Sequence, residues 1–176
     1  MENAGTEKHK YYQCEIFAMS GAKLQHNIVA TNILVALANK LEGKSCQPFN
    51  SETRIHIEKN SLFTYPDISV ICVDSHTRND DEMNILNPII IFEVLSPSTR
   101  NYDRGEKFRL YRDIPTLREY VLIEPETIGV EKYQINESGK WELEEFALIE
   151  DSLLLKSIGS SLTLKEIYKR TKVFAG

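Results

Sequence analysis

A single glutamate interrupts the most apolar segment of the chain. Glu93 lies in the run 89–95, in which every other residue is apolar. An ionised carboxylate in a strand covered on both faces is strongly unfavourable unless a metal ion, a cation or a proton compensates its charge. Leu95, which would lie on the same face of the strand, cannot compensate it. We therefore expect another element to supply the partner of Glu93.

A second carboxylate precedes the other long apolar run. Asp67 follows Pro66 and comes directly before residues 68–73. If the two runs pair as central strands, both carboxylates converge at one end of the sheet. Their oxygens would suit Mg²⁺ or Mn²⁺, with waters completing the coordination. Two simpler interpretations stay open, in which Pro66–Asp67 is only a turn and Glu93 pairs with an arginine.

Lys107 lies on a helix that we predict over about 101–112, after a short Ser/Pro connection from the strand of the glutamate. Such a helix packs back over the sheet, with Phe108 and Tyr111 as packing residues. The simpler alternative for the lysine is an exposed i,i+4 pair with Asp103, which would contribute only a few tenths of a kcal/mol. Basic side chains also outnumber acidic ones here, a weak sign of a phosphate-facing surface: Arg100, Arg104, Lys107, Arg109 and Arg112 against Asp103, Glu106 and Asp113.

The other elements indicate a mixed α/β domain. Residues 23–41 form the clearest helix, because apolar side chains recur at three- and four-residue steps: Leu24, Ile28, Leu34 or Val35, Ala38 and Leu41. We predict further strands at 11–19, around 47 and at 53–58, the last of them half-exposed. Residues 74–87 should form a surface loop or short helix. A meander should follow at 119–123, 130–135 and 141–148, and a short helix should begin after the capping box of Thr163 and Glu166.

Length and composition limit the classes of protein. The 176 residues fit one domain, and we expect a flexible segment at 1–10 followed by a single domain at 11–176. The net charge of −5 excludes a global basic field for binding nucleic acid. Cys14, Cys46 and Cys72 lack close spacing, so we expect neither a disulfide framework nor a structural zinc site. The sequence has no signal-peptide pattern and no membrane-spanning window, and we expect a cytoplasmic protein.

Several motifs together resemble a known family. They are Pro66–Asp67, the run 92–99 (Phe-Glu-Val-Leu-Ser-Pro-Ser-Thr), the run 102–107 (Tyr-Asp-Arg-Gly-Glu-Lys) with Tyr111, and, nearer the N-terminus, residues 15–21, His26–Asn27 and 50–54. This combination resembles the Uma-type "putative restriction endonuclease" family, which is placed in the PD-(D/E)XK nuclease superfamily. The resemblance implies an α/β (α+β mixed-sheet) fold with a restriction-endonuclease-like core, flanking helices and an antiparallel meander.

The resemblance also implies roles for the three charged residues already singled out. In the superfamily, acids at the positions of Asp67 and Glu93 bind the metal, and we expect the backbone carbonyl of Val94 to join them. A lysine normally stands two positions after the second acid, where this chain has Leu95. The resemblance therefore implies that the lysine has moved to the following helix, as Lys107.

Secondary candidates come from the same comparison. His26 takes the place of the acidic residue that many superfamily members carry on the first helix, or it merely hydrogen-bonds a loop. Glu52 and Arg54 are further candidates, although Arg54 could simply face solvent. We expect Ser96, Ser98 and Asp103 to shape the turn and cap the helix.

The predicted function is metal-dependent hydrolysis of DNA phosphodiester bonds by a metal-activated water, with Mg²⁺ or Mn²⁺ as cofactor. DNA is the expected partner, and a homodimer is expected by analogy with the superfamily. The alternative is a decayed nuclease fold that acts as a DNA-binding or protein-interaction module, as Leu95 at the lysine position would suggest.

Overall fold

A computed structural model describes residues 9–12, 15–18, 23–72, 77–78 and 81–174. Residues 1–8 of the segment expected to be flexible lie outside the described residues, whereas residues 9 and 10 belong to a strand. No helix in the described part of the chain is long and apolar enough to cross a lipid bilayer.

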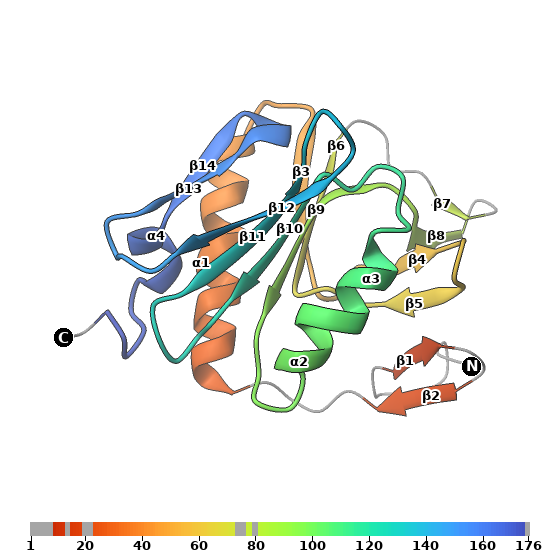
Figure 1. Ribbon diagram of the computed structural model, residues 1–176, viewed down its shortest axis with the longest axis horizontal. Helices are drawn as coiled ribbons and strands as arrows, with labels where there is room; N and C mark the ends of the chain where they lie inside the picture. The colour runs from red at the N-terminus through yellow and green to blue at the C-terminus, as the bar shows by residue number, and fades with distance from the viewer. Residues whose placement is uncertain (1–8, 13–14, 19–22, 73–76, 79–80, 175–176) are drawn as a thin grey trace.

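A six-stranded mixed sheet forms the centre of the molecule (Figure 1). The order is β12-β11-β10-β9-β6-β3, and only β9 and β10 are parallel neighbours. The two apolar runs become β6 and β9, which do pair with each other, in antiparallel orientation. The strand bounds are β3 Cys46–Asn50, β6 Ile68–Cys72, β9 Pro88–Val94, β10 Glu119–Ile123, β11 Val130–Ile135 and β12 Trp141–Phe146.

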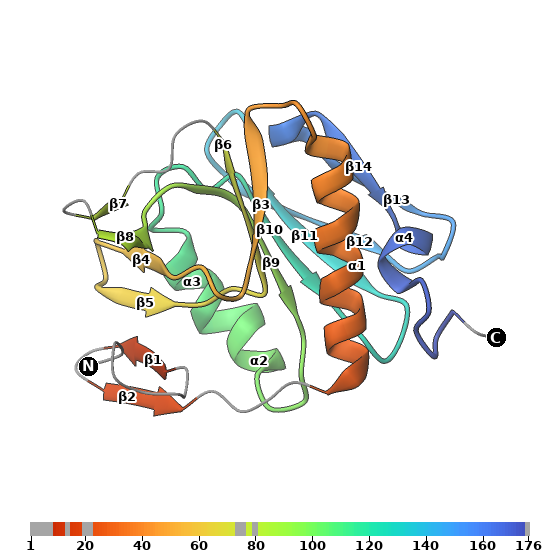
Figure 2. The ribbon, with the colours of Figure 1, turned by 180° about the vertical axis from the view of Figure 1, so that it is seen from behind.

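Helices cover both faces of this sheet (Figures 1 and 2). On one face lie α1 (Leu24–Leu41), α4 (Leu164–Tyr168) and the hairpin of β13 (Ser152–Leu155) and β14 (Ser160–Thr163). On the other lies a continuous helical segment made of α2 (Arg100–Tyr102), the π-helical turn η2 (Asp103–Lys107) and α3 (Phe108–Tyr111). This segment provides the crossover that the parallel strands β9 and β10 require.

Alternate residues of β9 therefore enter two different cores. Ile90, Phe92 and Val94 pack on the α1 face, whereas Ile91 and Leu95 pack on the α3 face. Because successive side chains of a strand point to opposite faces, Glu93 points toward α2, η2 and α3. The crossover helix is thus the element able to supply its partner.

Helix α1 has the predicted bounds but a different buried face. Its buried residues follow four-residue steps: Gln25, Val29, Ile33, Leu37 and Leu41. Leu24, which we expected in the apolar pattern, is 71% exposed; of the alternatives Leu34 and Val35, Leu34 packs against the core and Val35 is 53% exposed. The true face includes a polar residue, because the Oε1 atom of Gln25 accepts the backbone N–H of Lys172 at 3.0 Å. Val29, Ile33, Leu37 and Leu41 form an apolar four-residue series in the sequence, whereas hydropathy gives no sign that Gln25 belongs to the same face.

A second six-stranded sheet corrects three predictions. In place of the single strand expected over 11–19, the structure has the antiparallel strands β1 (His9–Tyr12) and β2 (Glu15–Ala18), and β7 and β8 lie within 74–87, where a loop or short helix was expected. Strand β4 is buried throughout, including His56, which stacks on Phe63 at 4.1 Å between ring centroids. The sheet order is β2-β1-β5-β4-β8-β7, with β1 His9–Tyr12, β2 Glu15–Ala18, β4 Ile55–Ile57, β5 Leu62–Thr64, β7 Thr77–Arg78 and β8 Asp81–Ile85.

The C-terminal part follows its prediction more closely. β10, β11 and β12 form the expected antiparallel meander. The capping box is present, since Thr163 accepts the backbone N–H of Glu166 and the Glu166 side chain accepts that of Thr163. A 3₁₀ turn, η3 (Lys156–Ile158), joins β13 to β14, a hairpin that was not predicted.

The expectation against disulfides is wrong for one pair. Cys46 of β3 and Cys72 of β6 face each other in the register of the two strands and form a disulfide. Their separation of 26 residues gave no sign of this, because the antiparallel pairing and not the sequence spacing brings them together. Cys14 lies outside the described residues.

Candidate functional site

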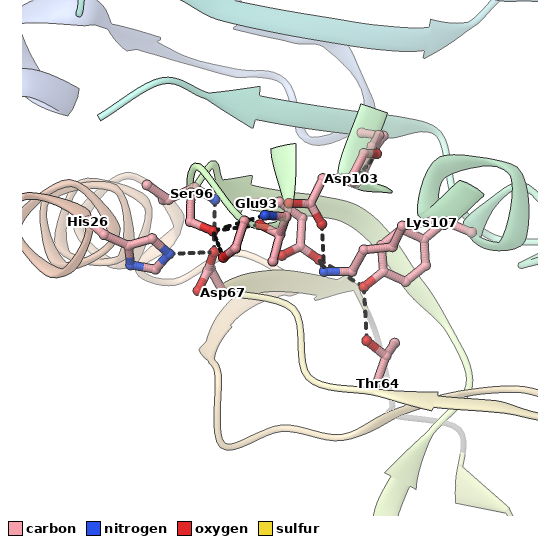
Figure 3. A network of polar contacts seen from close by, with 12 residues as sticks. His26, Thr64, Asp67, Glu93, Ser96, Asp103 and Lys107 are labelled. Carbon is pink, nitrogen blue, oxygen red and sulfur yellow. Dashed lines mark hydrogen bonds and ion pairs between the residues drawn. The ribbon is translucent and has the colours of Figure 1, made fainter. Parts of the chain in front are cut away.

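The pairing of β6 with β9 brings the two predicted carboxylates together. Ile68 is the register partner of Phe92, so the next positions outward, Asp67 and Glu93, lie side by side. Residues opposite each other in an antiparallel pair project from the same face of the sheet. Asp67 is held in this position because its Oδ2 atom accepts the backbone N–H of Val94 at 2.8 Å. Figure 3 shows the two carboxylates in one network.

Glu93 is buried but has two polar partners. It is 4% exposed, and its Oε1 atom lies 2.7 Å from Nζ of Lys107. The same oxygen accepts the hydroxyl of Tyr111 at 2.8 Å. Burial raises the pKa of Glu93 to about 7, while the Lys107 ammonium opposes this rise and the nearby carboxylates of Asp67 and Asp103 add to it. The carboxyl group therefore titrates near neutrality.

The π-helical turn η2 directs Lys107 toward the sheet. Within this turn Asp103 and Lys107 are both buried, at 2% and 9% exposure. The ammonium of Lys107 lies 3.3 Å from Oδ1 of Asp103, in addition to its contact with Glu93. Burial disfavours the charged lysine, but the two carboxylates outweigh this and raise the pKa of Lys107. π-helical turns within α-helices often occur at functional sites.

The exposed Asp103–Lys107 pair considered from the sequence is therefore a buried pair that belongs to this network. Thr64 also joins the network, because its Oγ1 atom lies 3.4 Å from the hydroxyl oxygen of Tyr111. Tyr111 has the predicted core position, and its hydrogen bond to Glu93 is an additional role.

His26 reaches the network from the first turn of α1. Its Nε2 atom lies 3.2 Å from Oδ2 of Asp67. Burial lowers the pKa of His26, but the hydrogen bond and the charge of Asp67 outweigh this effect, so the pKa is raised overall. The side chains of His26 and Asp67 are 14% and 19% exposed, more than those of Glu93 and Lys107. Solvent thus reaches the network from the His26–Asp67 side.

Leu95 occupies the position at which the superfamily pattern has its lysine. It is buried in the core on the α3 face of the sheet. The ammonium that contacts Glu93 is that of Lys107, which lies on the crossover helix, as the family resemblance implied.

Among the described residues, the contacts of Glu52 and Arg54 lie outside this network. Glu52 is exposed, and its backbone N–H donates to Oδ1 of Asn50 at 3.0 Å. Arg54 donates to Oδ1 of Asn84 at 2.8 Å and lies 5.6 Å from the ring centroid of Phe63. These contacts belong to the second sheet and its loops. The prediction that both residues belong to the site therefore has no support from the described contacts.

Two basic side chains of the crossover helix are engaged in ion pairs with glutamates outside the helix. Arg100 pairs with Glu124 at 2.9 Å, and Arg104 pairs with Glu131 at 2.7 Å. These ion pairs fasten the helix to the meander. Arg109 contacts Glu106, and Arg112 lies over the ring of Phe108.

Asp103 and Tyr111 are site residues that the sequence reasoning assigned elsewhere. Asp103 was expected to cap the helix, but its described side-chain contact is with Lys107, not with a backbone N–H. The available signal was spacing, since Asp103, Lys107 and Tyr111 follow four-residue steps on one helix. The turn prediction for Ser96 is confirmed, because its hydroxyl accepts the backbone N–H of Thr99 and contacts the hydroxyl of Ser98.

The donor atoms of the network fit a divalent cation that keeps several waters. Within the described residues, no three His, Cys, Asp or Glu side chains form a cluster that could hold a metal by themselves. The described contacts to Asp67 use Oδ2 and those to Glu93 use Oε1, which leaves Oδ1 and Oε2 for a ligand. Mg²⁺ is commonly held by one or two carboxylates plus waters and substrate oxygens.

The charges of the network lead to the same conclusion. When ionised, Asp67, Glu93 and Asp103 carry three negative charges against the one positive charge of Lys107. A divalent cation would reduce this excess of negative charge. Buried charges are tolerated when they are paired or coordinate metals.

Known proteins share both the sequence and the fold of this chain. A family model described as "Putative restriction endonuclease" (Uma2) matches residues 1–165. Two uncharacterized proteins of Synechocystis sp. (strain ATCC 27184 / PCC 6803 / Kazusa) are 37% and 35% identical, over 96% and 82% of this chain and 87% and 81% of their own lengths. A crystal structure of a "putative nuclease belonging to DUF820" from Anabaena variabilis ATCC 29413 superposes with a TM-score of 0.77 at 17% identity, covering 93% of this chain and 91% of that one.

Proposed function

Because the chain belongs to the Uma2 family, described as "Putative restriction endonuclease", we propose that it is a metal-dependent endonuclease that hydrolyses phosphodiester bonds in DNA. The observation that carries the proposal is the meeting of Asp67, Glu93 and Lys107 at the end of β6 and β9. Two carboxylates for a cation and one ammonium for a phosphate are the groups that this reaction needs.

Asp67, Glu93 and the backbone carbonyl of Val94 would hold the Mg²⁺ or Mn²⁺ ion in this proposal. When bound, such a cation supplies a water with a lowered pKa and neutralises negative charge on the scissile phosphate. The hydrogen bond from the Val94 N–H and the contact with His26 keep the Asp67 carboxylate oriented toward Glu93. Oriented ligands reduce the reorganisation that binding requires.

Lys107 would stabilise the charge that develops on the phosphate oxygens. Its raised pKa keeps the ammonium protonated at neutral pH. A buried ammonium acts more strongly on a developing charge than an exposed one, because less water screens it. The phosphate would approach from the His26–Asp67 side, where the network is accessible to solvent.

The proposed DNA contact is local. The chain carries a net charge of −5, and Arg100 and Arg104 are committed to ion pairs with glutamates of the meander. A homodimer would allow both strands of a duplex to be cut, and we include it in the proposal by analogy. We also propose a cytoplasmic location, although the Cys46–Cys72 disulfide argues against it because reducing compartments keep thiols unpaired.

The direct test is cleavage of single- and double-stranded DNA by the purified protein in Mg²⁺ or Mn²⁺. We expect cleavage by the wild type and none by the Asp67→Asn, Glu93→Gln double variant. A matched control is Glu119→Gln, which neutralises a buried carboxylate on the opposite face of the sheet and should retain activity. Equal cleavage by the wild type and the double variant would refute the proposal.

Calorimetry with Mn²⁺ separates this proposal from a decayed nuclease that only binds DNA or protein. An intact site should bind Mn²⁺ in the wild type and in Glu119→Gln, and lose it in Asp67→Asn and in Glu93→Gln. A decayed site should give the same absence of heat in all four proteins.

A further inference from the structure

The buried carboxylate of Asp103 is not explained by the reaction chemistry proposed above. It is 2% exposed, and its described side-chain contact is the ion pair with Lys107 at 3.3 Å. Its Oδ1 atom makes no hydrogen bond among the described residues. A buried carboxylate with so few partners destabilises a fold, so its presence needs a reason beyond packing.

Lys107 has two possible partners, but a metal would compete for one of them. In the structure the ammonium lies 2.7 Å from Glu93 and 3.3 Å from Asp103. A cation bound to Glu93 would reduce the negative charge that this carboxylate offers to the ammonium. Without a second carboxylate, Lys107 would then be a buried ammonium with weakened compensation, and metal binding would be opposed.

The π-helical turn makes the second partner available. Asp103 and Lys107 are the first and last residues of η2, and both point from the helix into the network (Figure 3). The hydroxyl of Tyr120 donates to the backbone carbonyl of Asp103 at 3.0 Å, which fixes this turn over the sheet. Asp103 is therefore held beside the lysine by contacts that do not involve Glu93.

We propose that Asp103 is a positioning residue that retains Lys107 in the site when Glu93 binds a divalent cation. The ammonium shifts its main ion pair from Glu93 to Asp103 as the cation binds, without leaving the network. This inference rests on the proposed function, because it assumes that Glu93 is a metal ligand. It assigns to Asp103 a role in cation affinity through Lys107, distinct from any contact with the cation.

A double-mutant cycle on Mn²⁺ affinity, measured by calorimetry, tests this role. Asp103→Asn should weaken Mn²⁺ binding in the wild-type background by about tenfold more than in the Lys107→Met background, a coupling within the usual range for contacting residues. If Asp103 acts only through its own charge on the cation, the two backgrounds should show the same loss, and the proposal is wrong. Glu119→Gln is the control for loss of a buried carboxylate and should show no coupling to Lys107.

The outcomes distinguish this proposal from the function on which it rests. Absence of Mn²⁺ binding by the wild type would refute the metal site itself. Binding by the wild type with an additive cycle would refute only the role of Asp103. Asp103→Glu, which preserves the charge, should restore most of the coupling.

A measurement on the wild type covers the case in which a variant fails to fold. The Lys107 ammonium can be followed by ¹⁵N side-chain NMR during titration with Mg²⁺. We expect its hydrogens to stay protected from exchange with water at saturating Mg²⁺, because Asp103 still holds the ammonium. Rapid exchange at saturation would show that Lys107 leaves the network and would overturn the proposal.

Discussion

Neutralising Glu93 should change how the stability of the fold depends on pH. In the folded protein, burial raises the pKa of Glu93 to about 7, compared with an ordinary value of 4.5. At about 1.4 kcal/mol per pKa unit, this difference corresponds to about 3 kcal/mol. Because the folded state holds the proton more tightly, the stability due to Glu93 is fully present below pH 4.5 and is lost as pH rises through 7.

The expected result is a pH-dependent difference between wild type and Glu93→Gln. Relative to the wild type, the free energy of unfolding of Glu93→Gln should rise by about 3 kcal/mol between about pH 4.5 and pH 8. Urea unfolding at intervals of pH, in the presence of a chelator, measures both proteins without divalent cations. Glu58→Gln is the control, because Glu58 is exposed and should give a difference that does not vary with pH in this way.

The sign of the difference decides which interaction dominates Glu93. Burial and the Lys107 ammonium act in opposite directions on its pKa, and burial is the larger effect. A difference that is flat or falls with rising pH would mean that the ion pair at 2.7 Å prevails. The argument that a cation is needed to compensate Glu93 at neutral pH would then be refuted.

Three further predictions concern single interactions, each measured by urea unfolding. Tyr111→Phe removes the hydrogen bond to Glu93 and should lower the free energy of unfolding by about 1–3 kcal/mol. The loss should be larger at pH 8 than at pH 5, because the ionised carboxylate is the stronger acceptor. An equal loss at both pH values would contradict this. Reducing the Cys46–Cys72 disulfide, which joins residues 26 positions apart, or replacing its cysteines should lower the free energy of unfolding by about 3 kcal/mol. A urea midpoint that is the same with and without reductant would argue against the disulfide. Thr163→Ala should cost about 1 kcal/mol through loss of the helix cap, whereas no change would mean that this cap does not stabilise α4.

The central strands and their carboxylates were predictable because the relevant physics is local in sequence. A nearly unbroken apolar run predicts a strand buried on both faces, and a glutamate within it predicts an unusual partner. The helix after β9 was predictable in the same way, including the burial of Phe108 and Tyr111.

Other features depend on which segments meet. The inner face of α1 includes Gln25, which is buried because the distant Lys172 backbone donates to it. Strands β7 and β8 lie in a polar segment that hydropathy assigned to a loop. The Cys46–Cys72 disulfide requires the antiparallel register of β3 and β6. The Gln25–Lys172 and Cys46–Cys72 contacts join distant segments, and β8 enters its sheet through the pairing of Ile85 with the distant Ile55 of β4, so no short window of sequence contains both partners.

The sequence by itself singled out Asp67 and Glu93 by residue type and by the apolar runs beside them, and Lys107 through the family resemblance, but it did not identify the buried Asp103. Only the tertiary structure decided how these charges are compensated. The register of β6 and β9 puts the two carboxylates side by side, and the π-helical turn places both Asp103 and Lys107 over Glu93. Electrostatic compensation depends on distances of a few ångströms between distant segments, and those distances are fixed by packing.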